Sequence, residues 1–135
     1  GHSISLEIVQ KMHNADLLKK MEQVDIVIDQ LIIGWHGIFA LEAMALGKPV
    51  ICYLREDLKE LYSYTTGNFH GLGCPIISAS VTTIKSALKD LINDKNLAEI
   101  GRKSRRYVEE FHSLEAIGGI FEKINQEIQL NATHR

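Results

Sequence analysis

Cysteine is scarce in this 135-residue chain, which contains only Cys52 and Cys74. The two residues do not form a CxxC motif, and no Cys/His cluster has the spacing of a zinc site. Cys52 lies in the apolar run at residues 50–54, where a reduced and buried thiol is the ordinary interpretation. No pair of carboxylates is spaced to hold a divalent cation. We therefore expect no disulfide framework, no metal site and no cofactor.

An excess of positive charge and a long apolar run are also lacking. The formal net charge is −2, whereas a domain whose main partner is nucleic acid requires clustered Lys and Arg. The one dense basic run, at residues 102–106, is interpreted as a solvated helix face. The longest apolar stretch, at residues 31–45, is interrupted by two glycines, a histidine and a glutamate, so no segment is suited to cross a membrane. No signal peptide is visible either, which predicts a cytoplasmic protein.

The length fits one compact domain and leaves no room for two of ordinary size. Hydrophobic residues make up 45% and charged residues 24% of the chain, so an ordinary globular core can form. We assign residues 4–130 to this domain. Residues 1–3 resemble the remnant of a purification tag, and residues 131–135 are expected to form a tail.

Short apolar segments alternate with longer amphipathic segments along the chain. Strands are predicted at residues 4–9, 24–29, 50–54 and 75–78. Helices are predicted from Asn14 or Asp16 to about Met21, at residues 38–46, within the polar loop 55–73 around residues 58–64, and at residues 81–93, 96–111 and 114–129. This alternation, with helices too long for hairpin connections, predicts an α/β fold with a Rossmann-like, mostly parallel sheet flanked by helices.

The most informative segment runs from residue 34 to residue 51. A buried strand leads into a turn bracketed by Gly34 and Gly37, and a helix begins at once at Ile38. In an open α/β sheet, ligands bind in the crevice beyond the carboxyl ends of the strands. The free amides at the start of this helix suit phosphate oxygens, and Gly37 has no Cβ to obstruct them. Gly47 and Pro49 are expected to end the helix.

Glu42 is the one charged residue of this apolar helix. A carboxylate is costly to bury there unless a partner compensates it. One interpretation is that Glu42 faces the crevice and accepts hydrogen bonds from two vicinal hydroxyls, such as those of a ribose. The other is that it pairs with a nearby lysine or stays in water. The residues alone leave both interpretations open.

The pattern G-x-x-G-x-x-x-x-E-A-M-A-x-G-K-P-V-I at residues 34–51 closely resembles the nucleotide-sugar motif of retaining glycosyltransferases with the GT-B fold. This large family includes sucrose synthase and many bacterial polysaccharide enzymes. Residues 15–30 resemble the helix and strand that precede the motif, and residues 100–113 resemble the closing helices. The resemblance covers nearly the whole chain and implies the C-terminal, nucleotide-sugar-binding domain of such an enzyme, truncated at its N-terminal side.

The resemblance gives roles to three positions of the motif. Glu42 matches the second glutamate of the paired-glutamate motif, which holds the ribose hydroxyls. Gly37 and Ile38 match the turn and helix start whose backbone amides reach the diphosphate or the donor sugar. The resemblance thus implies a UDP-, GDP- or ADP-sugar as donor substrate, without a metal ion.

The first glutamate of the family motif is replaced here by Gly34, which leaves the contact to the donor sugar unassigned. Trp35 and His36 fill the rest of the turn. They either take over this contact by stacking or hydrogen bonding, or simply pack the turn. Lys48 is interpreted as structural, at the end of the helix. No catalytic residue is assigned.

The resemblance also implies parts that this chain does not contain. These are an acceptor-binding domain and the opening of the donor domain, whose basic residues neutralise the diphosphate. Arg55 is a conceivable substitute, although a solvated loop residue is the simpler interpretation. We expect the chain alone to turn over nothing, and the full-length protein to transfer a sugar to a glycan or lipid-linked acceptor in polysaccharide biosynthesis, in the cytoplasm or at the inner face of the membrane.

The strands implied as lost would lie between residues 4–9 and the strand at Asp25. The remaining strands then close up, pair with another copy to form a homodimer, or expose a sheet edge. Two other functions remain open. One is another GT-B enzyme, such as a phosphorylase or a sugar-nucleotide epimerase. The other is a non-catalytic α/β interaction module that keeps the fold without binding nucleotides.

Overall fold

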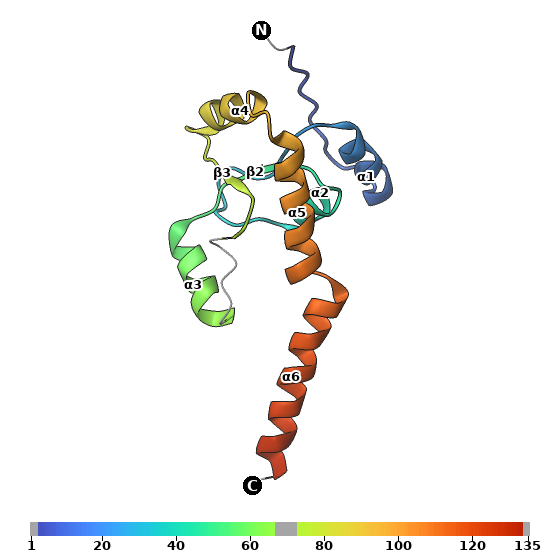
Figure 1. Ribbon diagram of the computed structural model, residues 1–135, viewed down its shortest axis with the longest axis vertical. Coiled ribbons are helices and arrows are strands. Elements are labelled where there is room, and N and C mark those ends of the chain that lie inside the picture. The colour runs from blue at the N-terminus through green and yellow to red at the C-terminus, as the bar shows by residue number, and fades with distance from the viewer. Residues whose placement is uncertain (1–2, 67–72, 134–135) are drawn as a thin grey trace.

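The computed structural model describes residues 3–66 and 73–133 and shows an α/β domain (Figure 1). The elements in chain order are α1 (Asn14–Gln23), β1 (Val27–Ile28), α2 (Ile38–Ala45), β2 (Val50–Cys52), α3 (Glu56–Thr66), β3 (Ile77–Ser78), α4 (Ile84–Ile92), α5 (Leu97–Phe111) and α6 (Leu114–Thr133). The three strands form a parallel sheet in the order β1-β2-β3. The predicted α/β class is confirmed at this level. Residues 1–2 of the predicted tag remnant, 67–72 of the predicted loop and 134–135 of the predicted tail lie outside the described residues.

The central strand β2 is buried on both faces, which explains its continuous apolar sequence. Val50 and Cys52 pack with residues of α1, α2 and α5 in one core cluster. Ile51, whose side chain points to the opposite face, packs with residues of α4 in a second cluster. All three of these side chains are 0% exposed. The domain is therefore built in three layers, with helices on both faces of a small sheet.

The prediction of a strand at residues 4–9 is wrong. The segment forms no sheet pairing, and Ile4, Leu6 and Ile8 are 62%, 74% and 76% exposed. Glu7 instead forms an ion pair with Lys20 of α1. Alternating apolar residues favour a strand only where another strand supplies hydrogen bonds and a core covers one face. Neither is present beside this segment in the part of the chain that the structure describes.

The contact between α2 and α5 is unusually close at one point. Gly47 follows α2 with φ at 73°, the left-handed conformation that was predicted to end this helix. A Cβ added to Gly101 of α5 would lie 2.1 Å from the carbonyl oxygen of Gly47. Ser104 and Tyr107 continue the buried face of α5 toward the core. A residue without a side chain is therefore required where α5 crosses the end of α2.

The carboxyl end of α1 is tied to the loop after α2. Lys48 Nζ donates a hydrogen bond to the backbone carbonyl of Glu22, at 2.9 Å. Lys48 is thus structural, as predicted, but it caps the end of α1 and not the end of α2. At its other end α1 begins after His13, and no side-chain hydrogen bond caps it, so neither Asn14 nor Asp16 serves as a cap.

Helix α6 extends away from the rest of the molecule (Figure 1). It continues beyond the predicted end at residue 129, and the glycine pair at 118–119 does not interrupt it. Several of its apolar side chains are exposed, among them Leu114 and Phe121 at 89% and 62%. No helix within the described ranges is both long and apolar enough to cross a membrane.

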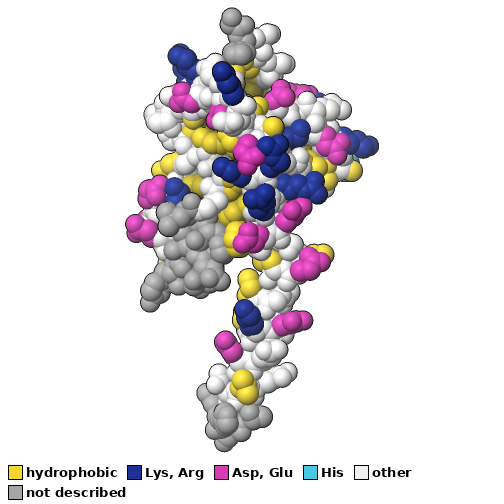
Figure 2. All heavy atoms as spheres, viewed as in Figure 1, with side chains coloured by type: hydrophobic (Ala, Val, Ile, Leu, Met, Phe, Trp, Pro, Cys, Tyr) yellow, Lys and Arg dark blue, Asp and Glu magenta, His cyan; other side chains and the backbone are white. Residues whose placement is uncertain are grey.

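The basic run at residues 102–106 lies on the outer face of α5. Figure 2 shows Lys and Arg side chains over this helix, next to acidic ones. Arg102 pairs with Glu99, and Arg105 pairs with Glu109, all with exposed side chains. The run is therefore the solvated helix face that the sequence predicted.

Candidate functional site

The turn between β1 and α2 is organised by the side chain of Gln30. Its Oε1 atom accepts hydrogen bonds from three nearby backbone amides, those of Ile32, Ile33 and Gly34, at 2.9, 2.7 and 3.4 Å. Its Nε2 atom donates to the carbonyls of Trp35 and Tyr53 at 2.5 and 3.1 Å. One carboxamide thus satisfies backbone groups that an irregular turn leaves without partners. Gln30 was not among the predicted site residues, although a polar residue directly after a buried strand was an available signal.

Gly34 adopts a backbone conformation that suits glycine, with φ at 97°. A Cβ at this position would lie only 2.3 Å from Cδ and 2.5 Å from Cγ of Arg55. The backbone amide of Arg55 also donates to the Gly34 carbonyl, at 2.8 Å. The space that a glutamate would need at position 34 is therefore filled by the aliphatic part of Arg55.

The guanidinium of Arg55 is directed to Asp57. Its Nε and Nη2 atoms donate to the two carboxylate oxygens of Asp57, at 3.0 and 2.5 Å. These hydrogen bonds raise the pKa of Arg55 and lower the pKa of Asp57. Both side chains are exposed, so the pair contributes little to stability. Any contact between Arg55 and a diphosphate would have to compete with Asp57.

The rings of Trp35 and His36 pack against each other and against neighbouring elements. Their centroids are 5.2 Å apart in a stacked arrangement, and Trp35 also lies 5.3 Å from the ring of Tyr62 in α3. His36 meets His112, which follows α5, edge to face at 6.0 Å. Burial, followed by the charge of His112, lowers the pKa of His36. The structure thus shows the packing role of both residues, and the contact to a donor sugar stays a prediction.

The amino-terminal end of α2 carries no side-chain cap. Its first intrahelical bond runs from the Leu41 amide to the Gly37 carbonyl. The amide of Gly37 donates to Oδ2 of Asp29, at 3.2 Å. The amides of the first turn, from Ile38 onward, are those that an α-helix leaves without intrahelical partners. A phosphate could accept from them, but it would meet the negative charge of Asp29 nearby.

Gly37 is not required by the fold itself. Its φ is −103°, which any residue can adopt, and a Cβ added there would meet nothing closer than Oδ2 of Asp29, at 4.0 Å. The missing side chain therefore leaves open space directly beside the start of α2. The close approach of a ligand at this position stays a prediction.

Glu42 lies one turn into α2, with its side chain half-buried. The neighbouring Ala40, Ala43 and Met44 are 0% exposed. Oε1 of Glu42 accepts a hydrogen bond of 2.7 Å from Nδ2 of Asn14, at the start of α1. The partner of Glu42 is thus an amide and not the lysine that one interpretation predicted. A neutral donor leaves the negative charge of the carboxylate uncancelled.

Beneath this turn lies the thiol of Cys52, which is 0% exposed and not in a disulfide. Burial, followed by the negative charge of Asp29, raises the pKa of Cys52 to about 12. The thiolate is therefore strongly disfavoured, and Cys52 is a core residue, as the sequence predicted.

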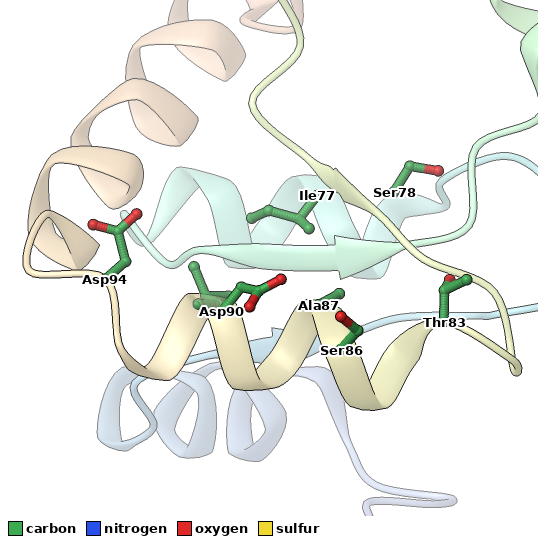
Figure 3. Close-up of a pocket in the computed structure, with 8 residues that line it drawn as sticks. Ile77, Ser78, Thr83, Ser86, Ala87, Asp90 and Asp94 are labelled. Carbon is green, nitrogen blue, oxygen red and sulfur yellow. The ribbon is translucent and has the colours of Figure 1, made fainter.

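A groove of about 450 Å³ lies elsewhere, between β3 and α4 (Figure 3). It is lined by Ile77, Ser78, Thr83, Ser86, Ala87, Asp90, Leu91 and Asp94. None of the predicted site residues contributes to it, and its two carboxylates oppose the binding of a diphosphate. Within residues 3–66 and 73–133, no group of three or more His, Cys, Asp or Glu side chains could hold a metal ion.

The six predicted site residues thus lie in one continuous turn and helix that follow β1. The structure adds three residues that act on this segment, namely Asn14, Asp29 and Gln30. Comparison of the chain with protein-family models, with curated proteins and with solved structures finds no match.

Proposed function

We propose that this chain is the donor-binding part of a GT-B glycosyltransferase and that it holds the nucleotide of a UDP-, GDP- or ADP-sugar. The observation that carries the proposal is the start of α2. This helix end lies beyond a strand of a parallel sheet and has no side-chain cap. Its N-cap residue is Gly37, a glycine that the fold does not require, and the Glu42 carboxylate lies one turn into the helix. This arrangement supports binding of a phosphate and a polyhydroxy group side by side.

Each part of the nucleotide has a proposed partner. The amide of Ile38 donates to the diphosphate, and the amide of Gly37 does so when it exchanges its bond to Asp29 for one to a phosphate oxygen. The carboxylate of Glu42 accepts hydrogen bonds from the ribose hydroxyls. It is suited to this role because its partner Asn14 is neutral and does not cancel its negative charge. The sugar is then transferred to a glycan or lipid-linked acceptor held by another domain, as the sequence resemblance implies.

Asp29 is the residue that opposes the proposal. Its carboxylate accepts from the Gly37 amide and places a negative charge where the diphosphate would lie. We therefore expect weak binding of nucleoside diphosphates by this chain. An α/β interaction module that binds no nucleotide is a second candidate, and this carboxylate is the observation that favours it.

The test is an NMR titration of the 135-residue chain with UDP, GDP and ADP, in which shift changes are mapped onto the backbone. We expect one or more of them to shift the amides of residues 37–42. Glu42→Ala removes charge-assisted hydrogen bonds and should weaken binding about tenfold or more. Glu122→Ala is the matched control, because it removes an exposed carboxylate of α6 and should leave affinity unchanged.

Gly37→Ala provides a second, independent variant. The added methyl group fits the folded chain, because its nearest neighbour would be 4.0 Å away. It should therefore leave stability unchanged while it obstructs the approach of phosphate and weakens binding. If no nucleotide shifts these amides in the folded chain, or if Glu42→Ala and Gly37→Ala bind as well as the wild type, the proposed function is wrong.

A further inference from the structure

Asn14 is the first residue of α1, but its side chain does not cap that helix. The N-cap position belongs to His13, and no side-chain hydrogen bond caps the helix. Asparagine is a poor residue inside a helix, where its amide usually bonds to nearby backbone groups. Here its Nδ2 atom donates instead to Oε1 of Glu42, 28 positions along the chain, at 2.7 Å. The side chain of Asn14 is thus directed at the one carboxylate of α2.

Helix α1 is fixed against this region by contacts that do not involve Asn14. At its carboxyl end, Lys48 donates to the Glu22 carbonyl at 2.9 Å, and Met21 is buried at 3% exposure. Since those contacts already hold α1 in place, its docking does not depend on the exposed bond between Asn14 and Glu42. What this bond does determine is the orientation of the Glu42 carboxylate.

We propose that Asn14 is the positioning residue of the nucleotide site, because its amide holds the Glu42 carboxylate in the orientation that receives the ribose hydroxyls. This inference rests on the proposed function. A carboxylate has about four acceptor positions on its two oxygens. The Asn14 amide uses one of them on Oε1, so Oε2 and the remaining position on Oε1 are left for the 2′- and 3′-hydroxyls.

Holding the carboxylate in advance lowers the cost of binding. A free glutamate side chain loses rotamer entropy when a ligand fixes it. In this chain, part of that loss has already occurred through the bond to Asn14. We therefore expect Asn14→Ala to weaken binding of a ribonucleotide about fivefold to tenfold. A nucleotide without ribose hydroxyls does not engage Glu42, so Asn14→Ala should leave its affinity unchanged.

The experiment compares UDP, GDP and ADP with their 2′,3′-dideoxy forms by NMR titration of the wild type and of Asn14→Ala. Initial slopes of the shift changes give relative affinities when binding is weak. Asp16→Ala is the matched control, since it changes an exposed residue of the same helical turn. Asn14→Leu keeps roughly the size of the side chain but removes the donor without adding a charge, and it should also weaken only the ribonucleotide.

The outcomes separate this inference from the proposed function. Selective loss of ribonucleotide affinity in both Asn14 variants, with Asp16→Ala unchanged, supports it. Equal losses for ribo- and dideoxynucleotides would show that Asn14 acts only on the fold, and would overturn it. If Glu42→Ala weakens binding while Asn14→Ala does not, the inference is wrong and the proposed function stands. If the wild type binds none of the nucleotides, both are wrong.

Discussion

Gly101→Ala tests the close approach of α5 to the end of α2. The added Cβ would lie 2.1 Å from the Gly47 carbonyl oxygen and 3.1 Å from its carbonyl carbon, whereas real Cβ contacts are essentially never below 3.0 Å. The obstructing atoms belong to the backbone, so no side-chain rotation can relieve the overlap. Helix α5 must therefore move away from the end of α2 by roughly 1 Å, at the cost of packing along their shared face.

The expected loss of stability follows from two opposing effects. Overpacking of this kind costs about 1–3 kcal/mol, and a backbone clash belongs at the upper end of that range. Alanine is favoured over glycine inside a helix by about 1 kcal/mol. We expect a net decrease of about 2 kcal/mol in the free energy of unfolding, a large fraction of the total for a domain of this size.

The assay is urea denaturation followed by circular dichroism and by the fluorescence of Trp35, the single tryptophan of the chain. Gly118→Ala in α6 is the control, because its Cβ would meet nothing within 4 Å. That variant should be as stable as the wild type, or more stable by up to about 1 kcal/mol. A Gly101→Ala midpoint at or above that of the wild type would refute the close contact between the two helices.

Three further predictions concern the turn and its surroundings. The Cys52 thiol should not react with a thiol reagent at pH 8 until the chain unfolds, because it is 0% exposed and its pKa is raised to about 12; rapid labelling of Cys52 in the folded chain would contradict its burial. The pKa of His36 in the folded chain is lowered from its ordinary value of 6.5, so the unfolded chain binds a proton more readily than the folded chain does. The free energy of unfolding should therefore fall as the pH decreases below about 6.5. His36→Gln should reduce this dependence in urea titrations at several pH values, and an unchanged slope would exclude His36 as its source. Gly34→Glu should destabilise the chain by about 1–3 kcal/mol, because the backbone at position 34 has a positive φ and the added side chain clashes with Arg55. Adding Arg55→Ala should restore the part of the stability that is lost to the clash. A thermal melt of Gly34→Glu equal to that of the wild type would disprove this reasoning.

The elements that the sequence predicted well are those whose signals are local. The apolar run of β2, the helix from Ile38 and the glycine that follows it are each specified by neighbouring residues. The left-handed φ of Gly47, for example, follows from its place between a helix and a proline. The same holds for the turn of the candidate site, whose glycines and helix start were visible in the sequence.

The elements that the sequence could not predict depend on distant partners. The short run of apolar and β-branched residues at 4–9 predicts a strand, but it cannot report whether another strand is present to pair with it. Lys48 and Glu22 are likewise far apart in the chain, and only the docking of α1 brings them together. The amide partner of Glu42 could not be predicted for the same reason, since Asn14 looks like a residue that starts its own helix.

Gln30 fixes the backbone of the turn, so the conformation of the turn does not depend on the side chains that it exposes. The carboxamide holds backbone amides and carbonyls, while the side chains of Ile32 and Ile33 point to solvent, 77% and 73% exposed. Their identity therefore contributes little to the conformation of the turn. Substitutions at these two positions would change the polarity of the surface at the edge of the candidate site, and with it the affinity for a neighbouring molecule. The backbone of that site would stay as it is.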